Sequence, residues 1–265
     1  MSESLLNFVP QANALDGRII LVTGADDGIG RAISKAYAGY GATVVLLGKT
    51  IAKLEAVYDE ITEAGSPEPA IYPLDMAGAT AHDYLELSKI LDEQVGGLDG
   101  LVLNAAWLPG FMPFEQYDLE SWQKVMTINL NANYLIVQAC LPLLKQSKHA
   151  SIIHSAHQLT RAYSGAFGIA KAGMTAMMDI VADEYDNPER FVRVNSIDSG
   201  PLNTQMRIVN YPGEDNTSNA SADAIIGPYL YFMSDDSALV TREKISYEKI
   251  DAAFVWPGME AVVKH

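Results

Sequence analysis

The sequence predicts a single α/β domain, a doubly wound parallel sheet that carries helices on both faces. From residue 18 onward, short runs rich in β-branched residues and leucine alternate with segments of helical periodicity. This alternation is typical of a parallel sheet covered by helices. The first run is followed directly by a glycine-rich turn that opens a helix, as in domains of this class. The 265 residues suffice for one domain with a well-buried core.

The elements follow one another in the order that this fold requires. Strands are expected at 18–22, 43–47, 70–73, 101–103, 151–155 and 193–197. Helices are expected from the glycine-rich turn to about Gly39, and then over 51–64, 80–94, 119–144 and 165–185. Because neither an internal repeat nor a low-complexity linker interrupts this series, residues 1–265 are read as one domain, with a core of about 15–248 and a tail of 249–265.

Residues 203–221 differ in character from the rest of the chain. They are polar and rich in turn-forming residues, and they lie between two periodic stretches. A loop this long inside a compact domain is usually functional or mobile. We expect a mobile lid at the substrate end of the sheet, the alternative being a variable surface loop.

The composition narrows the partners. The 33 acidic residues outnumber the 18 basic ones and give a formal net charge of −15. Nucleic acid and anionic membrane surfaces both require clustered positive charge, so neither is expected as a partner.

Cys140 is the only cysteine, which excludes an intrachain disulfide and predicts a buried thiol. Since the N-terminal residues lack the features of a secretory signal and no apolar run reaches the roughly 20 residues that span a bilayer, a cytoplasmic location is expected.

The glycine-rich turn predicts a dinucleotide-binding site in a Rossmann-like sheet. Glycine lets the backbone turn sharply and approach a pyrophosphate closely, and the following helix N-terminus offers free N–H groups. The position of the turn after a buried strand, with a second strand about 20 residues further on, strengthens this interpretation over a plain strand-to-helix turn. The expected cofactor contacts here are Thr23, Gly24, Asp27, Gly28, Ile29 and Gly30.

Together with several later motifs, this turn resembles the short-chain dehydrogenase/reductase family over about residues 15–248. The Thr-Gly-x-x-x-Gly-x-Gly motif is complete at residues 23–30. Asp75 and Met76 match the position that contacts adenine in the family, and Asn104-Ala105-Ala106 resembles its Asn-Asn-Ala-Gly turn. The resemblance further implies cofactor contacts at Lys171, Gly200 and Thr204, the last of them to the nicotinamide carboxamide.

Lys49 decides which nicotinamide cofactor is expected. An NAD site usually places a carboxylate at the end of the second strand to bind the ribose 2′-hydroxyl. Here Gly48 and Lys49 stand at that point, and a cation can pair with a 2′-phosphate. We therefore expect NADP(H) rather than NAD(H). Asp26 and Asp27 oppose this expectation, because they add negative charge nearby. The alternative for Lys49 is a solvated charge at the start of the helix that binds no cofactor.

The catalytic motif of the family is altered at its central position. The resemblance implies a tyrosine that transfers a proton to or from the substrate oxygen, a lysine that lowers the pKa of this tyrosine, a serine, and a helix asparagine that supports a water relay. Lys171 and Asn129 match the lysine and the asparagine, but Phe167 occupies the tyrosine position. A phenyl ring has no ionisable proton, and general acid–base catalysis is typically worth about 10² to 10⁴ in rate.

Several residues are candidates for the missing groups. Counting back the usual family spacing from position 167 reaches His154, whereas alignment from the preceding strand reaches His157, and Ser155 is the only hydroxyl between them. We expect Ser155 or His157 to face the cofactor, with His157 as a proton donor near neutral pH. Tyr163, in the loop before the helix, is a second substitute. The two histidines lack a third ligand, so no metal site is expected.

Two hypotheses for function follow. The first is an oxidoreductase that binds NADP(H) and transfers a hydride to or from a carbonyl or alcohol, with His157, Tyr163 or water as the proton source. The second is a catalytically inactive sensor or scaffold that responds to NADP(H). An apolar substrate is expected from Trp107, Leu108, Phe111 and Phe114.

The helix over 165–185 also presents a face of small residues. This face is expected either to pack against another subunit, because the family commonly forms homodimers and homotetramers, or to be buried within the monomer. It comprises Ala166, Ala170, Gly173, Ala176 and Met177.

Overall fold

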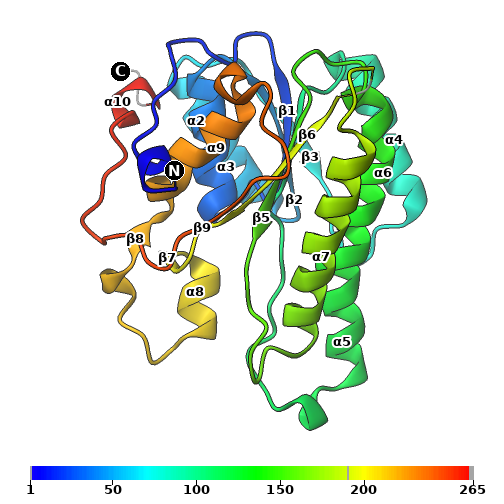
Figure 1. Cartoon of the computed structure of the whole chain (residues 1–265), viewed down its shortest axis with the longest axis vertical. Coiled ribbons are helices and arrows are strands. Elements are labelled where there is room, and N and C mark those ends of the chain that lie inside the picture. The colour runs from blue at the N-terminus through cyan, green and yellow to red at the C-terminus, as the bar shows by residue number, and fades with distance from the viewer. Residues whose placement is uncertain (1, 190, 263–265) are drawn as a thin grey trace.

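The computed structural model, which describes residues 2–189 and 191–262, is built on a seven-stranded parallel sheet (Figure 1). The strands follow the spatial order β3-β2-β1-β4-β5-β6-β9, and all six neighbouring pairs are parallel. Their bounds are β1 Ile19–Thr23, β2 Thr43–Gly48, β3 Ala70–Pro73, β4 Gly100–Leu103, β5 Ser151–Ala156, β6 Arg193–Asp198 and β9 Lys244–Ser246. The doubly wound fold expected from the sequence is confirmed.

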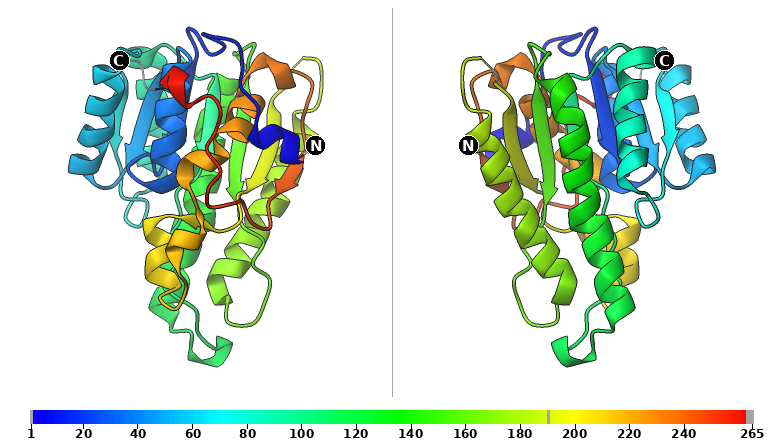
Figure 2. Two further views of the ribbon diagram at one scale, coloured as in Figure 1. Left: turned by 90° about the vertical axis from the view of Figure 1, so that its left-hand side faces the viewer. Right: turned by 90° about the vertical axis from the view of Figure 1, so that its right-hand side faces the viewer.

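Helices cover both faces of this sheet (Figures 1 and 2). One face carries α2 (Gly28–Gly39), α3 (Ile51–Glu63) and α9 (Ile226–Met233). The other carries α4 (Ala81–Ile90), α6 (Ala132–Leu144) and α7 (Gly165–Glu184). The remaining α-helices are α1 (Ser2–Leu6), α5 (Leu119–Met126), α8 (Gln205–Asn210) and α10 (Met259–Val262), and a small ribbon joins β7 (Leu202–Asn203) to β8 (Ala220–Ser221).

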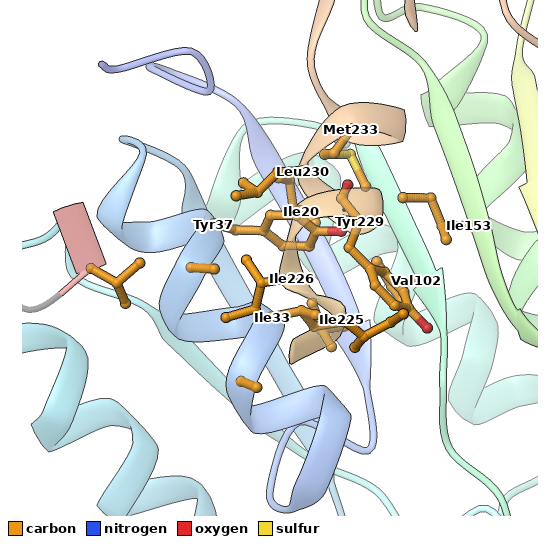
Figure 3. Close-up of a cluster of buried hydrophobic side chains, with 14 of the residues drawn as sticks. Ile20, Ile33, Tyr37, Val102, Ile153, Ile225, Ile226, Tyr229, Leu230 and Met233 are labelled. Atoms are coloured by element: carbon orange, nitrogen blue, oxygen red, sulfur yellow. Dashed lines mark hydrogen bonds between the residues drawn. The ribbon is translucent and has the colours of Figure 1, made fainter. Parts of the chain in front are cut away.

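Two apolar cores hold these layers together. On the α2 and α9 face, Ile20, Val102 and Ile153 of the sheet pack against Tyr37 and Tyr229, which are fully buried (Figure 3). On the other face, strand residues pack against α4, α6 and α7. Strand side chains thus bury on both faces, which explains why the strands read as continuous apolar runs rather than alternating ones.

Local sequence sets where the helices begin. The Asp27 carboxylate accepts a hydrogen bond from the Gly28 N–H at the start of α2, and the Asp118 carboxylate accepts one from Ser121 at the start of α5. Thr80 and Asp83 form a capping box at the start of α4. Each of these side chains satisfies N–H groups that the first helical turn leaves unpaired.

The structure corrects three expectations about the elements. The helix expected over 119–144 is formed by α5 and α6, joined by a π-helical turn at Thr127–Asn131. Residues 203–221 are not a continuous loop, because α8 and the ribbon strands lie within them. Strand β9 was not expected, since it is three residues long and only Ile245 within it is buried.

The tail folds back onto the chain that carries it. The Trp256 indole is buried, donates a hydrogen bond to the Phe8 carbonyl oxygen at 2.9 Å, and lies edge-on to Tyr40 at a centroid distance of 6.3 Å. Residues 263–265 of the tail lie outside the described residues.

The order of the strands positions the site. Strand β1 is followed along the chain by β2 and β3 on one side, and the chain then crosses back to β4 on the other side of β1. Connections leave the carboxyl ends of β1 and β4 in opposite directions and so open a crevice between them, which is where ligands bind in open α/β sheets.

Candidate functional site

A cleft of about 660 Å³ lies at this point of the sheet. It extends from the glycine-rich turn, past the ends of β1, β4 and β5, to α7 and α8. Most of the expected site residues contribute to its wall: Gly24, Asp27, Gly28, Ile29, Lys49, Asp75, Met76, Asn104, Ala105, Ser155, His157, Phe167, Lys171, Gly200 and Thr204.

Thr23 and Gly30, two of the expected cofactor residues, do not line the cleft but shape it from behind. The buried Thr23 hydroxyl donates to the Val102 carbonyl oxygen and accepts from the N–H groups of Asn104 and Ala105, at 2.9 to 3.1 Å. It thereby fixes the turn after β4 against the turn after β1. A Cβ atom on Gly30 would lie 1.9 Å from the Gly24 carbonyl oxygen, so only glycine permits this close approach of helix and turn.

Lysines and aspartates meet at the end of the cleft near β2. Lys49 and Lys53 both line the cleft there. The Asp27 carboxylate lies 2.6 Å from the Lys53 ammonium, and this hydrogen bond raises the pKa of Lys53. Asp26 lies against Gly48, since a Cβ atom on Gly48 would be 2.8 Å from the Oδ1 atom of Asp26. Asp27 is therefore neutralised by a cation, whereas Lys49 has no ion-pair partner within the described part of the chain.

Lys171 lies at the opposite end of the cleft, on α7. Its ammonium is buried and donates to the Ser155 carbonyl oxygen at 3.0 Å. Burial lowers the pKa of Lys171 to about 8, and the negative charge of Asp198 partly opposes this shift. The amine therefore changes charge within the range in which most enzymes operate.

Ser155 belongs to a buried hydroxyl network. Its hydroxyl lies 2.6 Å from the Tyr229 hydroxyl and donates to Asn104 Oδ1 at 3.2 Å. Tyr229 is fully buried on α9, and burial raises the pKa of its phenol. Tyr229 therefore reaches the cleft only through Ser155.

The Phe167 ring lies close to two polar groups of the catalytic end. It is buried, with the Lys171 ammonium 5.8 Å and the His157 ring 6.2 Å from its centroid. Position 167 therefore contributes an apolar surface to the cleft, where the resemblance implies a phenol hydroxyl.

Asn129 does not line the cleft. Its side-chain oxygen accepts from the Trp107 N–H, and its amide group donates to the carbonyl oxygens of Trp107 and Val125, at 2.8 to 2.9 Å. Its own carbonyl oxygen accepts from the Asn133 side chain at 3.1 Å. These bonds fix the loop after β4 to the π-helical turn, so the residue supports the wall of the cleft.

Two of the residues expected at the site lie outside the cleft. Tyr163 lies in the turn before α7, as expected, but its side chain is 60% exposed and is not part of the cleft. Phe114 is 71% exposed and does not line the cleft. Trp107 and Leu108 do line the cleft, and Phe111 approaches it indirectly by contacting Tyr211 at a centroid distance of 5.1 Å.

The segment expected to be a lid forms one side of the cleft through α8. Thr204 caps this helix by accepting from the Arg207 N–H at 3.3 Å, and its methyl group packs against Gly28. Arg207 pairs with Glu214 and stacks on the Tyr211 ring at 3.4 Å from the centroid. Met206 and Val209 add apolar surface to the same wall.

Sequence reasoning missed Asp198, Tyr229 and Lys53. Asp198 had a signal, since it is a carboxylate at the carboxyl end of a buried strand, where functional groups gather. Lys53 lies in the first turn of α3 and Lys49 just before its N-cap Thr50, so their closeness in the sequence was a signal that both stand at the start of this helix. Tyr229 had no such signal in the sequence, because nothing in the order of residues connects α9 with Ser155.

The small-residue face of α7 is divided between the two expectations. Ala166 and Ala170 are buried within the monomer, whereas Ala176 is exposed.

The described residues include no group of three or more histidine, cysteine, aspartate or glutamate side chains suited to a metal ion. No helix among them has the length and apolar character needed to cross a membrane.

Comparison with known proteins gives one consistent result. Residues 18–215 match the short chain dehydrogenase family. The chain is 37% identical over 235 residues to the uncharacterized oxidoreductase YciK of Escherichia coli (strain K12), covering 88% of this chain and 92% of that protein.

Two solved structures are similar throughout. A short chain dehydrogenase from Shigella flexneri 2a str. 301, complexed with NADP, has a TM-score of 0.85 and 37% identity, covering 89% of this chain and 99% of that one. One from Escherichia coli CFT073, complexed with NADPH, has a TM-score of 0.85 and 38% identity over the same shares. With its sheet order, glycine-rich turn and cleft, the protein belongs to the short chain dehydrogenase family.

Proposed function

We propose that this protein is an NADP(H)-dependent oxidoreductase that transfers a hydride to or from an apolar carbonyl or alcohol, in an atypical active site that draws no proton from position 167. The observation that carries the proposal is the cleft itself. It joins a glycine-rich helix N-terminus, Lys49 with no ion-pair partner among the described residues, a buried Lys171 and an apolar wall in one continuous space.

The residues at the β2 end of the cleft fit NADP(H). The glycines leave a cradle that a Cβ atom would fill, and the helix N-terminus favours an anion. Lys49 offers a cation for a 2′-phosphate, and the ion pair with Lys53 removes the repulsion that Asp27 would otherwise exert. Asp26 beside Gly48 is the one feature that favours a free 2′-hydroxyl. The complexes of the two similar dehydrogenases with NADP and NADPH support the phosphorylated cofactor.

The bound cofactor would supply or receive the hydride. For the chain's own residues, Lys171 is placed to hold the nicotinamide ribose, and Asp75 and Met76 to contact the adenine. We assign Thr204, the N-cap residue of α8, to the nicotinamide carboxamide; it lines the cleft together with Gly200 and packs against Gly28. Trp107, Leu108, Met206 and Val209 form an apolar wall that excludes water from the reacting carbonyl.

A fluorescence titration with NADPH and NADH tests the cofactor. We expect NADPH to bind more tightly, and Lys49→Ala to weaken NADPH binding about 10- to 100-fold with little effect on NADH, since a charged hydrogen bond contributes about 1.5 to 3 kcal/mol. Lys89→Ala, on an exposed lysine of α4 far from the cleft, is the matched control. Equal weakening of both nucleotides by Lys49→Ala would contradict its assignment to the 2′-phosphate.

The second candidate function is a catalytically inactive sensor or scaffold that responds to NADP(H). Phe167 favours it, because the ring removes the usual proton donor without changing the cofactor end of the cleft. Selective NADPH binding without turnover of any carbonyl would support this candidate, and absence of nucleotide binding would exclude both.

A further inference from the structure

We infer that His157, oriented by Asp198, exchanges the proton with the substrate oxygen in this active site. The inference rests on the proposed function and deepens it, since it names the group that replaces the missing phenol. The evidence for it is that the His157 ring lines two cavities and that the Asp198 carboxylate lies next to this ring.

The Asp198 carboxylate is held in place at the end of β6. It accepts a hydrogen bond from the Gln158 N–H at 2.7 Å and one from the Gly200 N–H at 3.1 Å. Its Oδ1 atom lies 3.6 Å from His157 Nδ1. Burial alone would raise the pKa of Asp198, but His157 and the two N–H groups outweigh it and lower the pKa. The side chain is therefore a fixed negative charge.

This contact assigns different roles to the two nitrogens of the His157 ring. A carboxylate beside Nδ1 favours the proton on that nitrogen. Nε2 is then left for exchange with a ligand, and within the described residues no hydrogen-bond partner is recorded for it. An aspartate that fixes the tautomer of a catalytic histidine in this way is a known solution in other enzymes.

His157 also occupies the right place in the cleft. Its ring lies edge-on to Phe167, 6.2 Å between centroids, on the surface where the resemblance implies a phenol. It lines both the main cleft and a second cavity of about 260 Å³, which reaches Asp198, Thr175 and Lys244. The ring is therefore accessible from the main cleft on one side and from a second cavity with the polar side chains of Thr175 and Lys244 on the other.

The neighbouring polar groups are less suited to this role. Tyr163 is exposed and outside the cleft, and the Ser155 hydroxyl is bonded to Tyr229 and Asn104. His154 is buried, lines neither cavity, and has a pKa lowered well below its usual value by burial and by Lys171. Lys171 donates to the Ser155 carbonyl oxygen and is the group proposed above to hold the nicotinamide ribose.

The step balances as a carbonyl reduction. The hydride from the reduced nicotinamide forms the new C–H bond at the carbonyl carbon, and the C=O π pair becomes the pair of a new O–H bond. The proton of that bond comes from Nε2 of the imidazolium form of His157, which becomes neutral and then takes up one proton (H₃O⁺) from solvent, the proton that the overall reaction consumes. The carbonyl compound is reduced to an alcohol and NADPH is oxidised to NADP⁺; alcohol oxidation reverses each transfer.

Substitution of the two residues tests the inference by activity. We expect His157→Ala to lower the turnover number about 10²- to 10⁴-fold, to leave NADPH affinity within about twofold, and to regain part of the loss when imidazole is added. Asp198→Asn removes the charge and keeps an acceptor for only one of the two N–H groups, because Gln158 donates to Oδ2 and Gly200 to Oδ1. We expect it to lower turnover less than His157→Ala does and to leave NADPH affinity within about twofold. His149→Ala is the matched control, because His149 makes a similar contact with Asp235 at 2.9 Å far from the cleft. Full turnover in His157→Ala would overturn the inference.

A second readout does not depend on activity. Nitrogen NMR of the cofactor-free protein, labelled on histidine and assigned with His157→Ala, reports which ring nitrogen carries the proton. We expect neutral His157 to be protonated on Nδ1 in the wild type and to shift toward Nε2 in Asp198→Asn, while His149 is unchanged. Protonation on Nε2 in an active wild type would overturn this inference alone. Failure of the wild type to reduce any carbonyl would instead overturn the proposed function, and the catalytic role with it.

Discussion

Phe167 shows how one residue can remove a chemical group while leaving the surrounding geometry in place. The ring keeps the contacts that a tyrosine ring would make with His157 and with the Lys171 side chain. What is missing is the hydroxyl, and with it the proton. The Lys171 ammonium remains buried against the Ser155 carbonyl oxygen, so the catalytic end of the site keeps its cation.

Restoring the hydroxyl should compensate for loss of His157. In the His157→Ala background we expect Phe167→Tyr to raise turnover about 10²- to 10⁴-fold, because the phenol would again stand near Lys171 and supply general acid catalysis. Rates of carbonyl reduction for the single and double variants check this, with Phe167→Leu in the same background as control. A double variant as slow as His157→Ala would mean that the site no longer accommodates a phenol in a productive position.

The burial of Lys171 should appear in the pH dependence of stability. Its pKa is about 8 in the folded protein against a usual 10.5. Between these two values the unfolded chain holds a proton that the folded protein has lost, so the free energy of unfolding rises with pH in that window. The full effect is about 3 kcal/mol at most.

Lys171→Met should therefore stabilise the protein, relative to wild type, more below pH 8 than at pH 10. Urea unfolding of both proteins across this range measures the difference. Lys145→Met, on an exposed lysine, should leave the pH dependence unchanged. A wild type and Lys171→Met that differ equally at every pH would show that the amine is not desolvated.

At the level of single residues, the sequence predicted the groups but not all their partners. It identified Lys171, Ser155 and His157, and the structure brings all three to one cleft. It placed Tyr163 outside the helix, which is confirmed, but offered it as a substitute donor, whereas the side chain faces solvent. The contact of Asp198 with His157 joins β6 to the segment after β5, and only tertiary folding creates such a pair.

Among the elements, the turn between β1 and α2 is the most tightly packed part of the site. Gly30→Ala should destabilise the protein by about 1 to 3 kcal/mol, a typical cost of overpacking, because the new methyl group would overlap the Gly24 carbonyl and crowd the Asn104 side chain. It should also weaken NADPH binding, since the turn must shift.

Gly78→Ala is the control for this substitution, because a Cβ atom there would contact nothing within 4 Å. Thermal unfolding and NADPH titration of the two variants check the prediction. Similar stability and NADPH affinity for Gly30→Ala and Gly78→Ala would show that the turn accommodates the extra methyl group without a loss of free energy of unfolding.

The strands and long helices could be predicted because their periodicity is strong, and most of their bounds agree within two residues. The elements that were not predicted, α8, α9 and β9, are all short. Strand β9 buries only Ile245 and α8 buries none of its residues, whereas α9 is apolar nearly throughout, so none of the three shows a periodic pattern over several turns or strand residues. The π-helical turn at Thr127–Asn131 depends on side-chain bonds of Asn129 and Asn133 to backbone groups, which periodicity does not record.

For the whole molecule, the cleft joins parts of the chain from both cores, so cofactor binding should stabilise the entire fold. NADPH at about 100 times its dissociation constant should add about 2.7 kcal/mol to the free energy of unfolding. For a domain of this size that corresponds to a rise in Tm of roughly 5 to 10 °C. Calorimetry should give a single transition, because both cores share one sheet. Two transitions, of which only one moves with NADPH, would contradict this.

The most direct test of the whole account is turnover. Purified protein should be incubated with NADPH and a panel of apolar aldehydes and ketones, with NADH in parallel, and the alcohol product identified. We predict that at least one compound is reduced, with one alcohol formed for each NADPH consumed, and that His149→Ala retains this activity while His157→Ala loses it. NADPH that binds but is never consumed, with any compound of the panel, would contradict the assignment of this protein as an oxidoreductase.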